Sequence, residues 1–179
     1  MTDLSGKKVA IIATDFFEEA ELVQPRDALR AAGAEVRIYS TGTDPIQAVE
    51  GDTTPTQKVE VDGSLDDLDV SAVDAVVVPG GTVNADRIRV EERARAIARE
   101  TLDAGKPLAV ICHGPWLLVS AGLVEGRRLT SYESLAVDIK NAGGDWVDEE
   151  VVVDQNLITS RNPGDLDAFV GALEDALAG

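Results

Sequence analysis

The stretch "LAVICHGPWLL", Leu108 to Leu118, decides the fold because an apolar run passes through a short turn directly into a helical pattern. It also contains the only cysteine and the only histidine of the chain, the neighbours Cys112 and His113. A buried strand followed at once by a helix is typical of a doubly wound α/β sheet. Ligands of such sheets bind where the strands end, so this corner is a predicted functional site.

The flanking sequence repeats the same alternation of strands and helices. Apolar, β-branched runs predict strands over 7–14, 34–40, 73–81 and 107–112, and helical spacing predicts helices over 19–33, 90–107 and 114–122. Beyond them we expect a short strand over 126–132, a helix over 134–144, a hairpin over 149–161 and a helix over 163–178. The polar segment 41–69 predicts one excursion strand, in "KVEVDGSL". The alternation implies a mostly parallel sheet with helices on both faces.

Composition sets the limits on the class of protein. The length of 179 residues and the 44% hydrophobic share fit one domain, 1–179. Neither a leader nor an apolar run of membrane-spanning length is present, so we expect a soluble, cytoplasmic protein. One cysteine forms no internal disulfide, and no cluster of cysteine or histidine suggests a metal site or a cofactor.

The charge balance is strongly acidic. Asp and Glu number 33 against 16 Lys and Arg, a formal net charge of −17. Such a charge repels phosphate backbones and anionic lipid, so we expect neither nucleic acid nor a membrane as a partner. It fits adaptation to high salt and an ordinary acidic cytosolic protein equally well.

The position of Cys112 favours a reactive thiol over an inert, buried one. A sharp strand-to-helix turn lifts the side chain out of the sheet, as in a nucleophile elbow, and Gly114 permits close approach of the backbone. The start of the following helix is expected to lower the pKa of the thiol by favouring the thiolate. His113 is either a general base or a donor of its backbone N–H to an oxyanion.

Two other predicted strands end at polar or glycine-rich corners. The backbone N–H groups of Gly80 and Gly81 in "VVVPGGT" are candidates for the other half of an oxyanion hole. Acidic residues cluster after the first strand, and one of them is expected to hydrogen-bond the thiol, stabilise an oxidised sulfur or carry a proton. The cluster consists of Asp15, Glu18, Glu19 and Glu21.

Four blocks of the chain resemble the PfpI-type intracellular protease family, within the class I glutamine amidotransferase-like superfamily. They are "TDFFEEAELVQP", "VVVPGGTVNADRIR", "KPLAVICHGPWLLVSAGLVEGRRLTSY" and "NAGGDWVDEEVVVDQNLITSRNPGDL", which together cover nearly everything outside 41–69. The resemblance implies a flavodoxin-like three-layer α/β sandwich with Cys112 as the nucleophile on its elbow and His113 beside it. It implies no cofactor.

The resemblance also assigns residues around the nucleophile. Glu21 matches the active-site glutamate, four residues before Pro25, and Glu18 matches a second acidic position. Asp86 matches an acidic residue that a neighbouring subunit contributes to the histidine in protease-like members. Tyr132 matches a tyrosine near the pocket, and Arg161 in "SRNP" is expected to close the site.

Several functions remain open at this point. The resemblance implies a cysteine-dependent hydrolase that acts on peptides, or on small dicarbonyls and glycated adducts in stress protection. The alternative is a non-catalytic redox sensor or chaperone-like stress protein in which Cys112 is oxidised. We expect a homodimer or a homohexamer, because the acidic partner of the histidine would come from another subunit.

Overall fold

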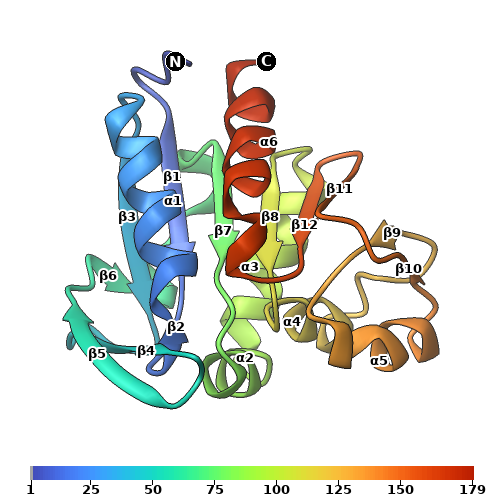
Figure 1. Ribbon diagram of the computed structural model, residues 1–179. Coiled ribbons are helices and arrows are strands. Elements are labelled where there is room, and N and C mark those ends of the chain that lie inside the picture. The colour runs from blue at the N-terminus through green and yellow to red at the C-terminus, as the bar shows by residue number, and fades with distance from the viewer. Residues whose placement is uncertain (1) are drawn as a thin grey trace.

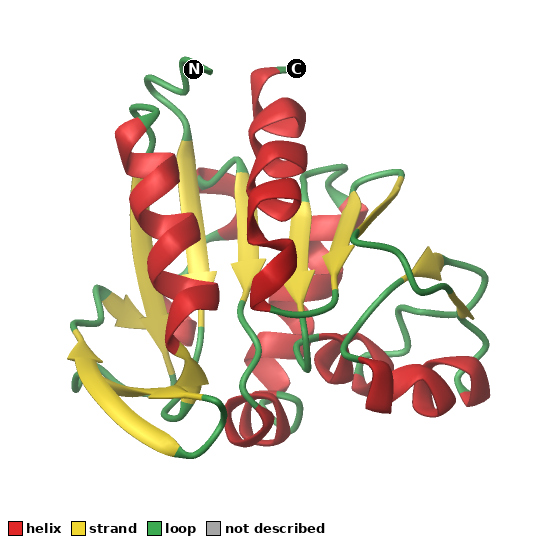
Figure 2. Cartoon of the chain, viewed as in Figure 1, coloured by secondary structure: helices red, strands yellow, loops and turns green. Residues whose placement is uncertain are grey.

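The computed structural model describes residues 2–179, which are built around a seven-stranded sheet (Figures 1 and 2). Six of its strands run parallel, and the edge strand β11 pairs antiparallel with β12. In spatial order the strands are β11 (Val151–Asp154), β12 (Leu157–Ser160), β8 (Leu108–Ile111), β7 (Ala75–Val78), β1 (Lys8–Ile12), β3 (Glu35–Ser40) and β6 (Gly63–Ser64). The predicted mostly parallel α/β fold is confirmed.

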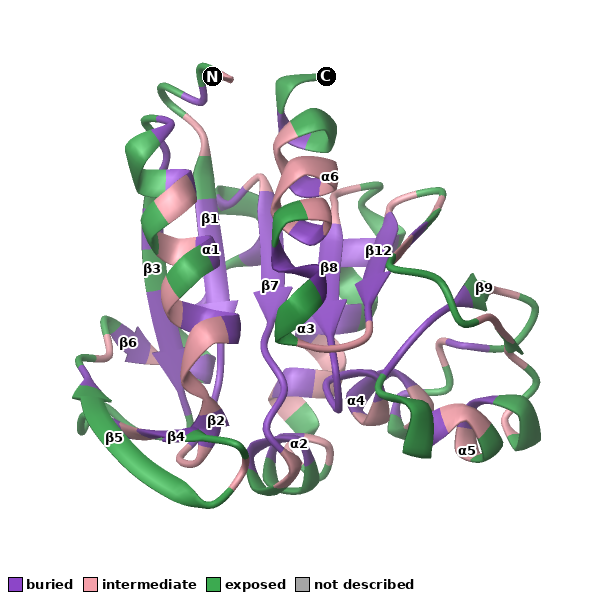
Figure 3. Ribbon diagram, viewed as in Figure 1, coloured by how far each residue is buried: buried purple, intermediate pink, exposed green. Residues whose placement is uncertain are grey.

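Helices cover both faces of this sheet. The helices α1 (Glu19–Ala31) and α6 (Leu166–Ala178) lie on the face toward the viewer in Figure 1. The other face is covered by α3 (Glu92–Asp103) and α4 (Pro115–Ser120), with α5 (Ala136–Asn141) at its side, and α2 (Thr82–Ile88) lies below the carboxyl ends of the strands (Figure 1). Side chains of each central strand alternate between two apolar clusters, which is why these strands read as continuous apolar runs. Figure 3 shows the central strands buried along their length.

The connection between β3 and β7 differs from the single predicted strand. It contains a hairpin of β4 (Ile46–Glu50) and β5 (Thr54–Val59), to which β2 (Phe17–Glu18) adds a third strand. The short β6 then returns to the main sheet. The residues of β5 are exposed except Val59, so the strand carries no apolar alternation by which a sequence pattern could reveal it. The hairpin extends below the carboxyl ends of the main strands (Figure 1).

The remaining connections are short. A two-stranded sheet of β9 (Arg128–Leu129) and β10 (Asp145–Trp146) flanks α5, and four 3-10 turns cover 65–67, 70–72, 133–135 and 163–165. The predicted hairpin 149–161 is present as β11 and β12, with Gln155 at a positive φ of 56° in its turn. Over residues 2–179, no helix is both long and apolar enough to cross a membrane.

Candidate active site

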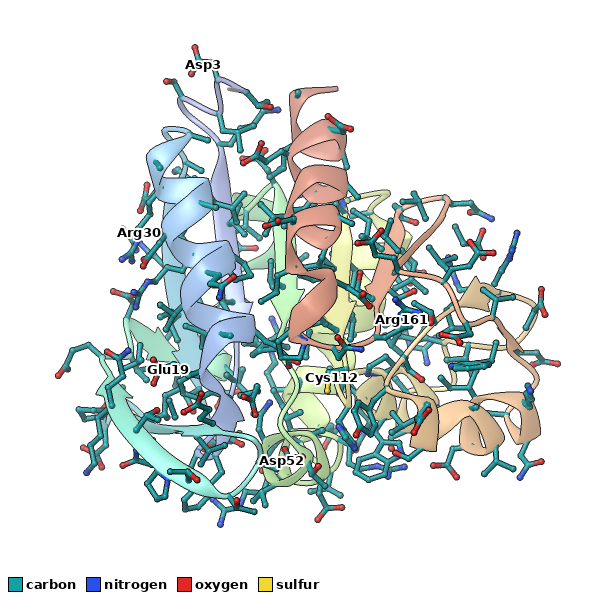
Figure 4. The ribbon with its side chains drawn as sticks, viewed as in Figure 1. Asp3, Glu19, Arg30, Asp52, Cys112 and Arg161 are labelled. Carbon is teal, nitrogen blue, oxygen red and sulfur yellow. The ribbon has the colours of Figure 1, made fainter. Side chains whose placement is uncertain are left out.

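Cys112 follows the last residue of β8 at the carboxyl edge of the sheet (Figure 4). Its φ is 62°, a left-handed conformation that costs a residue with a Cβ about 1 kcal/mol or more. Two neighbouring segments hold the backbone there, because the Cys112 N–H donates to the Ser160 carbonyl at 3.1 Å and the Cys112 carbonyl accepts from Tyr132 N–H at 2.8 Å. The elbow expected from the sequence is therefore present, and the surrounding strands stabilise it.

Gly114 allows the turn to close. A Cβ on Gly114 would lie 2.7 Å from Val110 Cγ1 and 2.9 Å from the Ile111 carbonyl oxygen. Any side chain at this position would push the elbow away from β8, so the glycine is required for the close approach predicted for it.

Glu21 lies in the first turn of α1 and is completely buried. Its Oε2 accepts a hydrogen bond from Gly80 N–H at 2.7 Å, and its carboxyl also contacts the Cys112 side chain. Burial raises the pKa of Glu21 to about 8, although both contacts favour the charged form. The carboxyl is therefore neutral at neutral pH and carries a proton that it can donate.

The thiol of Cys112 is only 6% exposed. Burial raises its pKa above the ordinary value, and the charge and hydrogen bond of Glu21 raise it further. Hydrogen bonds from the backbone N–H groups of Gly81 and His113 oppose this shift without overcoming it. The expectation that the helix start lowers this pKa is therefore wrong for the resting site, because desolvation outweighs the favourable backbone dipoles.

His113 lies beside the sulfur. Its Nδ1 is 3.3 Å from Cys112 Sγ, and its ring stacks on Tyr132 with the ring centroids 4.6 Å apart. Burial lowers the pKa of the imidazole, against the opposing charge of Asp52. The neutral imidazole that results is able to accept the thiol proton. The geometry thus favours the general-base alternative for this side chain, while the backbone N–H of His113 also faces the sulfur.

The glycine corner divides its two N–H groups between different tasks. The Gly80 N–H is occupied by Glu21, so it does not serve as the oxyanion donor expected from the sequence. The Gly81 N–H faces the sulfur, which leaves Gly81 and His113 as the candidate donors. A Cβ on Gly80 would lie 2.5 Å from Glu21 Oε2 and 2.6 Å from Cys112 Cβ, so only glycine fits between the acid and the thiol.

Of the other predicted residues, only Tyr132 contacts the histidine. Tyr132 is partly exposed above the histidine ring. The Glu18 carboxylate is engaged by the turn of the β4–β5 hairpin, where it accepts from Gly51 N–H at 3.0 Å and Asp52 N–H at 3.1 Å. Asp86 is exposed on α2, and Arg161 follows β12 and pairs with Asp165 and Asp148. Among the described residues, no group of three or more His, Cys, Asp or Glu side chains is arranged to hold a metal ion.

Sequence reasoning missed three residues that shape the site. Asn84 is fully buried on α2, where it accepts from Thr14 N–H at 2.6 Å and donates to the Gly80 carbonyl at 2.9 Å. Asp52 and Thr82 form a hydrogen-bonded pair next to His113. The only signal for Asp52 is the turn sequence "EGDT" inside a polar segment, and such a turn does not reveal what its side chain contacts.

Comparison with known proteins shows the family of the chain. The family model described as "DJ-1/PfpI family" matches residues 7–175. A deglycase of Thermococcus kodakarensis is 42% identical over 163 residues, covering 91% of this chain and 95% of the relative. A Bacillus subtilis protein named putative cysteine protease YraA is 38% identical over 165 residues, covering 92% and 94% respectively.

A solved structure gives the same result. The crystal structure of Drosophila melanogaster DJ-1beta matches with a TM-score of 0.87 and 31% identity, over 97% of this chain and 91% of that chain. The match therefore extends over the whole sheet and its helices. By sequence and by fold, the chain belongs to the DJ-1/PfpI family.

Proposed function

We propose that the protein is a cysteine-dependent enzyme that acts on small dicarbonyl compounds and the adducts they form on amines. The observation that carries this proposal is the composition of the buried site: a thiol only 6% exposed, with a neutral carboxylic acid on one side and an imidazole on the other. A thiol so enclosed favours a small carbonyl compound over an extended peptide. The similarity to a deglycase supports the same substrate class.

The first step would be addition of the thiol to an aldehyde carbon. The Sγ–C bond forms as the C=O π bond breaks, the thiol proton passes to His113 Nδ1, and the carbonyl oxygen takes the Glu21 proton. The Gly81 and His113 N–H groups stabilise the negative charge that develops on that oxygen. The product is a neutral hemithioacetal, with Glu21 now a carboxylate.

The following steps would use that carboxylate as a base. For a 2-oxoaldehyde, Glu21 removes the hydrogen of C1 as a proton and returns one to C2, while the hydroxyl proton on the C1 oxygen passes to the C2 oxygen. C1 thereby reaches the oxidation level of a thioester while the C2 ketone becomes an alcohol, so no external oxidant or reductant is needed. Water then hydrolyses the thioester to a 2-hydroxy acid and releases the Cys112 thiol. For a glycated amine, the S–C bond to Cys112 forms as the C–N bond breaks, and the amine leaves with the proton of Glu21. The same hemithioacetal results, and the steps above convert it to the 2-hydroxy acid.

Two other functions are the alternatives. A relative named a putative cysteine protease favours peptide hydrolysis with the same thiol and oxyanion donors. The single cysteine next to a protonated Glu21 also suits a redox sensor, because a thiol with no second cysteine is oxidised to sulfinate rather than to an internal disulfide. Mass spectrometry after mild peroxide treatment would support the sensor if Cys112 gained two oxygens in a protein that turns over neither class of substrate.

The decisive variant is Cys112→Ala, assayed on methylglyoxal, a methylglyoxal-modified amine and short peptides. Loss of the thiol should reduce turnover of the carbonyl substrates by roughly a thousandfold or more, because the covalent step is removed. The exposed substitution Asp175→Asn near the end of α6, away from the carboxyl ends of the strands (Figure 1), is the matched control and should retain full turnover. Equal turnover by wild type and Cys112→Ala would refute the proposal, and turnover of peptides alone would identify a peptidase.

The assembly and the role of Asp86 also remain proposals. We propose a homo-oligomer of at least two chains, in which the exposed position of Asp86 on α2 makes it available to a neighbouring copy. The similarity to the family supports the proposed homo-oligomer. Inside one chain, however, the Asp52 carboxylate is connected to the histidine through Thr82.

A further inference from the structure

The tip of the β4–β5 hairpin places a carboxylate against the start of α2. Both oxygens of Asp52 are engaged there, Oδ1 by Thr82 N–H at 2.7 Å and Oδ2 by the Thr82 hydroxyl at 2.9 Å. Asp52 has a positive φ of 64°, and the Glu18 carboxylate holds its backbone N–H at 3.1 Å. Figure 4 shows Asp52 near α2 and below Cys112. The hairpin therefore belongs to the surroundings of the active site, although it lies outside the main sheet.

The Thr82 hydroxyl connects this carboxylate to the histidine. Its Oγ1 lies 3.3 Å from His113 Nε2, on the side of the ring away from the thiol. The opposite ring nitrogen, Nδ1, is 3.3 Å from Cys112 Sγ. Asp52, Thr82, His113 and Cys112 thus form a continuous series of polar contacts, contributed by the hairpin, by α2 and by the elbow.

The positions of the hydrogens follow from the donor and acceptor capacities of these groups. A carboxylate only accepts, so the single hydroxyl hydrogen of Thr82 is used on Asp52. Toward His113 the hydroxyl oxygen then has only lone pairs to offer, and a hydrogen bond there requires a hydrogen on Nε2. A neutral imidazole carries one ring hydrogen, so Nδ1 has a lone pair directed at the thiol.

We propose that Asp52, acting through Thr82, is a positioning residue that fixes His113 in the Nε2-protonated tautomer, so that Nδ1 receives the Cys112 proton. The inference rests on the proposed function for its catalytic meaning, while the tautomer itself is a property of the free protein. The Nε2 hydrogen then has its acceptor, the Thr82 hydroxyl oxygen, within the same chain. Asp86 of a neighbouring copy is accordingly not needed to orient the ring.

The chain offers a direct measurement because His113 is its only histidine. In protein labelled with nitrogen-15 histidine, the two ring nitrogens give one set of signals, and their chemical shifts report which nitrogen is protonated. Wild type at neutral pH should show protonated Nε2 and bare Nδ1. An imidazole protonated on Nδ1 would overturn the proposal with no variant at all.

Three variants test the route through Thr82. Thr82→Val keeps the shape but removes the hydroxyl, and should give a mixture of tautomers; Thr82→Ser should restore the wild-type spectrum. Asp52→Gly tolerates the positive φ and frees the Thr82 hydrogen, so it should also lose the Nε2 preference. Thr53→Val, at the exposed neighbouring position of the same turn, is the matched control and should resemble wild type.

A second readout needs no substrate either. The rate of Cys112 alkylation by iodoacetamide should fall roughly tenfold in Thr82→Val and Asp52→Gly, because the base loses its orientation. Unchanged spectra and alkylation in both variants would refute the inference, as would an Asp86→Asn variant that alone disturbs the tautomer. If wild type shows His113 protonated on Nε2 but turns over no dicarbonyl, the proposed function is refuted and this inference stands.

Discussion

At the scale of single residues, the site depends on one carboxyl that the fold keeps neutral. Glu21 has an ordinary pKa of 4.5 when unfolded and about 8 in the folded chain, because burial penalises its charged form. Between these values the folded protein holds one proton more than the unfolded chain. Stability from this group is therefore greatest at low pH and is lost as the pH rises toward 8.

Glu21→Gln should remove this pH dependence. The amide keeps an acceptor for Gly80 N–H but does not titrate, so the free energy of unfolding of wild type should fall relative to the variant between about pH 4.5 and 8. The relative loss is on the order of a few kcal/mol. Urea unfolding at several pH values measures it.

The neighbouring carboxyl provides the control. A hydrogen bond from Thr56 lowers the pKa of Glu19 below its ordinary value, so Glu19→Gln should leave the loss of stability above pH 4.5 in place. Parallel stability curves for wild type and Glu21→Gln would contradict a neutral, buried Glu21.

At the scale of elements, α2 joins the ends of two central strands through Asn84. Its side chain accepts from Thr14 after β1 and donates to the Pro79 and Gly80 carbonyls after β7. These contacts hold the glycine corner at its distance from Glu21 and Cys112. The shape of the site therefore depends on a residue that does not touch the thiol.

Asn84→Ala should cost about 3 kcal/mol of unfolding free energy, because it leaves buried backbone donors and acceptors on two strands without partners. Asn162→Ala is the matched control: that asparagine caps a 3-10 turn with one hydrogen bond to Gly164 N–H and should cost only about 1 kcal/mol. Urea unfolding compares the two. If the cost of Asn84→Ala did not exceed that of Asn162→Ala, Asn84 would not be the residue that joins the ends of β1 and β7.

At the scale of the whole molecule, the charge of −17 opposes association of identical chains. Added salt screens this repulsion, so the proposed oligomer should become tighter as ionic strength rises. Sedimentation velocity at low and at near-molar salt, over a range of protein concentrations, measures the equilibrium. A monomer under every condition would contradict the proposed assembly.

The sequence also predicted most of the main sheet. The strands β1, β7 and β8 are apolar and buried apart from Lys8, and each ends at a turn or helix signal, so local patterns are sufficient to find them. The hairpin of β4 and β5 escaped prediction because its exposed strand is held by main-chain pairing and by Glu18 rather than by an apolar face.

The sequence by itself determined the α/β fold and the position of Cys112 at the end of a central strand, because hydrophobic periodicity and turn residues are local properties. The tertiary structure alone decided the protonation of the site. Burial raises the pKa values of Glu21 and Cys112 and lowers that of His113, and burial depends on every element packed around them. The tertiary structure also brings Asp52 and Thr82, which are 30 residues apart, to the side of the histidine away from the thiol, because only folding joins the hairpin to α2.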